Sequence, residues 1–220
     1  MTIDHEFKQL EPRSPFRDAD GEKVIQLAYN YWQGLRTGTD IPLREDINPT
    51  CLEAALPHAF VAERLAPGMA RMRVAGQGLQ EMMKMELRAM PISSFLTVEA
   101  RTALMPLIES AFADPAAIEI ALKTEPAFGR RHIQARMLIL PLKDEHLEVS
   151  RILGVLVTDK RTIVRPCRFS FASNPVVRFE KLAEPKPAKV RLVAKAKQEK
   201  SDIDKILHIP PALRLVVDNT

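Results

Sequence analysis

Two arginines, Arg161 and Arg165, have a residue type and a spacing that could bind a phosphate group. The planar guanidinium group donates two parallel hydrogen bonds to one anion, so an Arg-x-x-x-Arg pair is compatible with nucleotide binding. The segment from Lys181 to Lys200 adds seven basic residues and only two acidic ones. This region therefore has two interpretations: a binder of nucleotides or nucleic acid, or a basic strand edge that faces solvent.

The spacing of Arg161 and Arg165 resembles that of cyclic-di-GMP receptors of the PilZ type. Those receptors also carry a downstream Asp/Asn-x-Ser-x-x-Gly motif, and no glycine follows Gly154 in this sequence. A formal net charge of +4 is too small by itself to indicate a nucleic-acid partner. Binding of a cyclic-di-GMP-like nucleotide or of nucleic acid through the basic C-terminal region is the alternative function, and of these nucleic acid is the less expected.

The sequence lacks the motifs that mark catalysis or a bound metal ion. Cys51 and Cys167 lie far apart and outside any Cys-x-x-Cys motif, which indicates two reduced thiols and not a zinc site. HExxH, GxSxG and glycine-rich phosphate loops are absent from the sequence. His132 lies in a polar stretch, 130–136, where a solvated or hydrogen-bonded histidine is the simpler interpretation. We predict a protein that is not an enzyme, with no catalytic residue, metal or cofactor.

Length and composition indicate one domain with appendages. The chain has 220 residues, of which 46% are hydrophobic, so a full core can form. Residues 1–20 have no apolar stretch of the kind found in a secretory signal, and we expect them to form a flexible arm. No apolar run approaches the roughly 20 residues that span a bilayer. We therefore expect a cytoplasmic protein that does not contact membranes.

The hydrophobic pattern predicts helices and strands in alternating blocks. A helix is predicted over 22–36, where apolar residues recur with helical spacing at Val24, Leu27, Ala28, Tyr31, Trp32 and Leu35. A second helix is predicted over 97–113, kinked by Pro106. Strands are predicted at 59–65, 69–75, 117–123, 130–140 and 151–158. The order of these elements is typical of the α+β class with an antiparallel sheet.

The last of these strands is apolar on both faces. Ile152 and Leu156 point to one side, and Leu153 and Val155 to the other. Both faces of the sheet must therefore be covered, one by the helices of the middle segment and the other by helix 22–36. We place the domain at 21–159, a sheet extension or small hairpin at 160–180, and a basic tail at 181–220.

Several short motifs near the N-terminus carry a family resemblance. They are Tyr31-Trp32, Leu35-Arg36, Ile41-Pro42-x-Arg44-x-Asp46-Ile47-x-Pro49, Leu56-Pro57 and Arg73-x-Ala75-Gly76. Over residues 22–158 the chain resembles the small single-domain PAS proteins of alphaproteobacteria, a divergent PAS subfamily. The resemblance implies a five-stranded antiparallel sheet of order 2-1-5-4-3 and a role in bacterial signal transduction through binding.

The resemblance also has limits that bear on ligands. A haem-binding PAS domain uses a histidine on the helix before the third strand, and 97–113 contains none. Cys167-Arg168-Phe169 is similar to a motif of flavin photoreceptors but follows the last expected strand, so we treat it as coincidence. Family members have a glycine-flanked acidic turn where this chain has 84–89, without glycine.

The resemblance implies that a ligand would lie between the sheet and helix 97–113. The residues predicted to point there are Phe60, Met72, Val74, Leu104, Leu107, Phe112, Ile133, Ala135 and Leu156. Either a small ligand occupies this space or the side chains fill it. The methionines Met69, Met72, Met82, Met83, Met85 and Met90 have the same two interpretations, an adaptable pocket or plain core.

With no kinase or cyclase domain in the chain, the expected output is contact with a protein partner in signalling. We also expect a homodimer, with Leu27, Tyr31, Trp32 and Leu35 as the predicted interface residues. Trp32 is predicted to be buried, against the outer sheet face or against the same helix of a second subunit.

Overall fold

The computed structural model describes residues 19–38, 40–125, 132–159 and 166–182. The helices are α1 (Ala19–Leu35), α2 (Gln77–Met83) and α3 (Val98–Ala113), with short 3-10 helices η1 (Arg44–Asp46), η2 (Pro49–Leu52), η3 (Leu56–His58) and η4 (Ile92–Phe95). The strands are β1 (Ala59–Ala66), β2 (Met69–Ala75), β3 (Ala116–Thr124), β4 (Gln134–Lys143), β5 (Val149–Thr158) and β6 (Phe169–Lys181). Most of the predicted arm at 1–20 and of the predicted tail at 181–220 lies outside the described residues. Where the two predictions overlap the described part they are wrong, since α1 begins at Ala19 and β6 ends at Lys181.

In the described part of the chain, six strands form one antiparallel sheet of order β2-β1-β5-β4-β3-β6. The α+β class and the order 2-1-5-4-3 are confirmed. The expected count of five strands is wrong. The segment 160–180, predicted to be either a sheet extension or a small hairpin, contributes the sixth strand, β6. Apolar residues of β6, among them Phe169, Phe171 and Phe179, pair along the edge of β3 and cover what would otherwise be an open strand.

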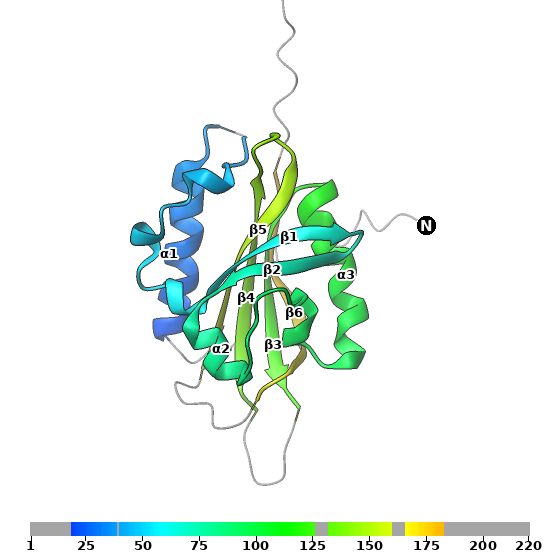
Figure 1. Cartoon of the computed structure of the whole chain (residues 1–220). Coiled ribbons are helices and arrows are strands. Elements are labelled where there is room, and N and C mark those ends of the chain that lie inside the picture. The colour runs from blue at the N-terminus through cyan, green and yellow to red at the C-terminus, as the bar shows by residue number, and fades with distance from the viewer. Residues whose placement is uncertain (1–18, 39, 126–131, 160–165, 183–220) are drawn as a thin grey trace, which may run out of the picture. The chain divides into compact units, whose positions relative to one another are not determined.

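Helices cover both faces of the sheet, and Figure 1 shows α1 and α3 on opposite sides of it. The inner core lies between the sheet and the layer of α2, η4 and α3, and the outer core lies beneath α1 and the 3-10 helices that follow it. Strand β5 contributes to both, with Ile152 and Leu156 in the inner core and Leu153 and Val155 in the outer core. The sheet is covered twice because its central strands are apolar on both faces.

Trp32 fixes α1 to the sheet. Its side chain is fully buried, and its indole Nε1 donates a hydrogen bond of 3.0 Å to the carbonyl oxygen of Pro141 in β4. The predicted burial is confirmed, and it occurs within one chain. The separate prediction of Trp32 as an interface residue is wrong, because the ring is enclosed by its own sheet. The neighbouring Tyr31 is half-buried, and its hydroxyl accepts a hydrogen bond from the Asn48 amide.

Charged side chains join α1 to the added strand β6. The Arg178 guanidinium lies 3.7 Å from the centre of the Tyr29 ring, and the Tyr29 hydroxyl donates to Glu180. Beneath them Arg136 donates to the buried Glu119 at 3.0 Å. Burial raises the pKa of the Glu119 carboxyl above its usual value, and the Arg136 guanidinium offsets this only in part. The position of β6 is thus tied to that of α1.

Candidate functional site

The predicted ligand residues were expected to line the space between the sheet and α3. Most of these residues are buried in the inner core there: Phe60, Met72, Leu104, Phe112, Ala135 and Leu156. Leu107 and Ile133 are half-buried and pack against that core. The structure therefore brings these eight side chains to one face of the sheet. The binding of a ligand among them stays a prediction.

Phe60 of β1 is one of the fully buried side chains on this face. It lies opposite Gly154 in the β1–β5 register, and a Cβ built on Gly154 would stand 2.0 Å from the Phe60 ring. Phe95 of η4 contacts the same ring, with 5.6 Å between the ring centres. The absence of a side chain at residue 154 thus makes room for an aromatic ring that the protein itself supplies.

Val74 does not belong to this set, and its prediction is wrong. Its side chain is 57% exposed and lies on the α1 face of the sheet, which is the outer face. The β1–β2 register explains the error: Ala62 pairs with Met72 and Val61 with Val74, so Arg73 is an extra residue. One extra residue in a strand reverses the facing of every residue beyond it, which moves Val74 from the inner face to the outer one.

The displaced Val74 forms part of an open apolar groove on the outer face of β1 and β2. The groove has a volume of about 400 Å³. Its floor is a cross-strand row of three side chains, since Val61 lies directly opposite both Val74 of β2 and Leu153 of β5. Cross-strand neighbours on one face pack against each other, so the row forms a continuous apolar strip.

The wall of the groove comes from the 3-10 helices that precede β1. Asn48 caps η2, its Oδ1 accepting a hydrogen bond of 3.0 Å from the Thr50 amide, and Pro49 follows at the first helical position. The lining residues from this segment are Arg44, Ile47, Pro49, Leu52, Leu56 and Pro57. The segment forms two short 3-10 helices, η2 and η3. In the sequence, Leu56-Pro57 stood out only as part of the PAS resemblance.

A second row, this one charged, runs beside the apolar row. Glu63 of β1 lies directly opposite both Arg71 of β2 and Arg151 of β5. Arg71 donates to Glu63 at 2.8 Å, Arg151 approaches it at 3.2 Å, and the extra residue Arg73 also pairs with it. We call the three arginines, together with the Glu63 that they share, the arginine triad of Glu63. The set carries three positive charges and one negative charge.

The charge state of the triad is set by its geometry. Burial tends to raise the pKa of the Glu63 carboxyl, but hydrogen bonds from Arg71 and Arg73 outweigh it and leave that pKa below its usual value. Glu63 is therefore ionised at neutral pH and neutralises one of the three guanidinium groups. Arg73 is the most exposed of them, with 52% of its side chain accessible. Sequence reasoning missed this cluster because its members become neighbours only through strand pairing.

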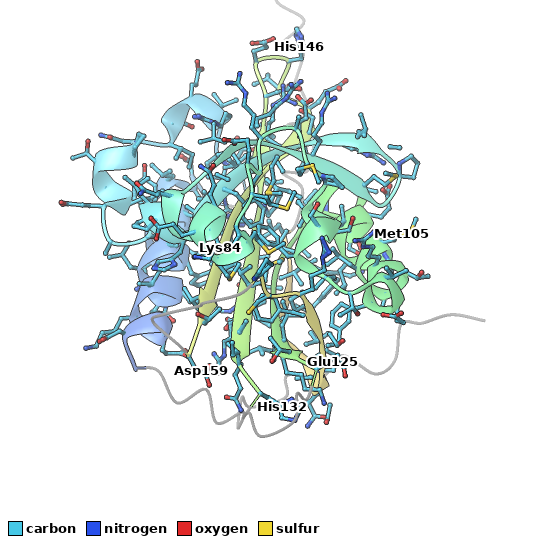
Figure 2. All side chains as sticks on the ribbon, turned by 60° about the horizontal axis from the view of Figure 1, so that its bottom comes forward. Lys84, Met105, Glu125, His132, His146 and Asp159 are labelled. Atoms are coloured by element: carbon cyan, nitrogen blue, oxygen red, sulfur yellow. The ribbon has the colours of Figure 1, made fainter. Side chains whose placement is uncertain are left out.

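The other residues considered for chemistry do not gather into a site. His132 is exposed, and its Nδ1 lies 2.7 Å from the Thr124 carbonyl oxygen. Figure 2 shows it at the same end of the molecule as Glu125 and Asp159, and far from His146. Cys167 is half-buried just before β6 and packs against the inner core. Among the described residues, no cluster of His, Cys, Asp and Glu could hold a metal ion. Arg161 and Arg165 lie outside the described residues.

The methionines are mostly structural. Met72, Met82 and Met83 are buried in the inner core, Met85 and Met90 pack against it, and Met69 is exposed. In the turn that follows α2, the glycine-free segment still adopts left-handed backbone, with φ of 54° at Lys84 and 67° at Ala89. Positive φ is unfavourable for residues with a Cβ, so this turn carries strain that glycine would relieve.

Comparison with known proteins identifies this architecture. A family model described as a PAS domain matches residues 22–157. The chain belongs to the PAS domain family. As a PAS domain it is a sensory or regulatory module, and the matched segment begins within α1, which carries Trp32. Strand β6 lies beyond the matched segment and is an addition to the PAS sheet.

Among solved structures, a similar chain comes from work described as "Flavin Analogue Sheds Light on Light-Oxygen-Voltage Domain Mechanism". The two chains are 16% identical, and the match covers 51% of this chain and 84% of the other. The TM-score is 0.35. No curated protein matches the chain. Among the described residues, no helix is both long enough and apolar enough to cross a membrane.

Proposed function

We propose that this PAS protein is a non-catalytic regulatory module of bacterial signalling that acts by contact with a partner protein at the outer face of β1 and β2. The observation that carries the proposal is the apolar groove above Val61, Val74 and Leu153. PAS domains commonly mediate protein interactions, and an exposed apolar surface is typical of an interaction site. Here the apolar surface adjoins the charged row around Glu63.

The inner face supports this assignment by contrast. Two of its side chains, Phe60 and Phe95, are fully buried against each other, and the Phe60 ring lies over Gly154. A small ligand there would have to displace them, whereas a partner at the groove needs no rearrangement of the core. We also propose that the protein receives a small ligand as its input signal and that it forms a homodimer. We further propose that it belongs to the subfamily of alphaproteobacterial single-domain PAS proteins.

The proposal is tested by affinity purification with quantitative mass spectrometry, comparing the full chain with its Val74→Arg variant. Val74 is exposed, so the substitution should leave the fold intact while it fills the groove. We expect partners that bind the full chain reproducibly and are lost with the variant. Partners recovered equally by both proteins, or none recovered by either, would refute contact through the groove.

A further inference from the structure

We infer that the groove and the arginine triad of Glu63 form one docking surface for an acidic segment of a partner protein, in which an apolar anchor lies near a carboxylate. This inference rests on the proposed function and specifies the chemistry of the partner. Two observations carry it: the alignment of an apolar row with a charged row, and the excess of positive charge in the second.

The two rows are held in a fixed relation by the strands. Val61 and Glu63 are two residues apart on β1, and Leu153 and Arg151 are two residues apart on β5, all on the outer face. Residues i and i+2 of a strand are about 7 Å apart. A partner segment that places an apolar side chain over Val61 therefore has its next contact, about 7 Å away, at the arginine triad.

That spacing defines the partner sequence. In an extended partner segment, a distance of about 7 Å separates the apolar anchor from an acidic residue two positions away. In a helical segment, the acidic residue lies three or four positions from the anchor. Either segment lays its apolar side chain into the groove and its carboxylate against the exposed guanidinium of Arg73. Guanidinium groups bind carboxylates through paired hydrogen bonds, which adds orientation to the attraction.

The charges around the groove select against a basic partner. The triad contributes three guanidinium groups and one carboxylate, and Arg44 adds another basic side chain to the groove lining. The acidic residues of the nearby wall, Glu45, Asp46 and Glu53, do not line the groove. An acidic segment gains attraction from this surface, whereas a basic one meets repulsion.

The experiment uses a phage-displayed library of random peptides, about 12 residues long, panned against the full chain, followed by fluorescence anisotropy with a labelled peptide from the enriched set. We expect enrichment of peptides with an Asp or Glu two to four positions from a large apolar residue. Binding should weaken as salt is raised and should fall about tenfold or more with Arg73→Glu. The matched control Lys123→Glu reverses a charge in the same way on β3, three strands away from β1, and should leave binding unchanged.

Val74→Arg separates the two parts of the surface. It fills the groove while it adds a positive charge, so loss of binding in this variant shows that the apolar anchor is required. Peptides that lose binding with Val74→Arg but carry no acidic residue, or are indifferent to Arg73→Glu, overturn the inference and leave the proposed function standing. If the enriched peptides bind both variants as well as they bind the wild type, the inference and the proposed function are both contradicted. The same two conclusions are contradicted if the wild-type protein is a dimer that binds no peptide and Val74→Arg is a monomer.

Discussion

Replacement of Trp32 by alanine should destabilise the domain strongly, because this side chain joins α1 to the sheet. The ring is fully buried among the side chains of the outer core, and its indole nitrogen donates to the Pro141 carbonyl oxygen. Truncation of a buried tryptophan to alanine typically costs about 3–5 kcal/mol, and loss of a buried hydrogen bond adds about 1 kcal/mol. We therefore expect Trp32→Ala to lower the free energy of unfolding by about 4–6 kcal/mol.

The assay is urea and thermal unfolding followed by far-ultraviolet circular dichroism. For a chain of this size 1 kcal/mol corresponds to roughly 2–4 °C, so the melting temperature should fall by about 8–24 °C. Trp32→Phe keeps most of the apolar volume but removes the donor and part of the ring, and it should cost less than Trp32→Ala, about 1–3 kcal/mol. Trp32 is the single tryptophan of the chain, so the fluorescence of the wild-type protein should show the blue-shifted emission of an enclosed indole.

Leu27→Ala is the matched control, since Leu27 lies on the same helix and is 38% exposed. It should change the free energy of unfolding by less than about 1 kcal/mol. A Trp32→Ala protein that melts at the temperature of Leu27→Ala would refute the reasoning. It would mean that α1 contributes nothing to the stability of the sheet and that the outer core beneath it is not formed.

Three further predictions concern strand packing, backbone strain and pH. Gly154→Ala should lower the free energy of unfolding by about 1–3 kcal/mol because its Cβ meets the Phe60 ring, whereas Gly34→Ala, with open space around it in α1, should raise it by about 0.5–1 kcal/mol in the same urea titration. Ala89→Gly should raise the melting temperature, since relief of its left-handed backbone is worth roughly 1 kcal/mol; an unchanged or lower value would show that the turn is not strained. The pKa of Glu63 is lowered in the folded state, so its contribution to stability is present above the ordinary value of 4.5 and is lost as pH falls through the folded pKa. The stability difference between the wild type and Glu63→Gln should accordingly be largest near neutral pH and shrink below pH 4.5, and a difference that stays constant from neutral to strongly acidic pH would contradict it.

The sequence by itself determined the elements whose signals are local. The helical stripe of α1, the β1–β2 hairpin around Pro67-Gly68 and the two apolar faces of β5 are all visible in the spacing of side chains along the chain. From these, the coverage of both sheet faces and the burial of Trp32 follow, because apolar residues on two faces need two partners. The PAS strand order came from the resemblance, which rests on short motifs in the same region.

The tertiary structure decided what depends on pairing between distant segments. Strand alternation placed Val74 on the inner face, and the extra residue Arg73 moved it to the outer one, a change of register that no pattern within β2 reveals. The same holds for β6, since its β-prone residues are equally compatible with a separate hairpin until the edge of β3 is there to receive them. Arg71, Arg73 and Arg151 likewise read as three unrelated surface arginines in the sequence. They become one charged site only because β1 places Glu63 between β2 and β5, and a cross-strand neighbour is set by the fold and not by distance along the chain.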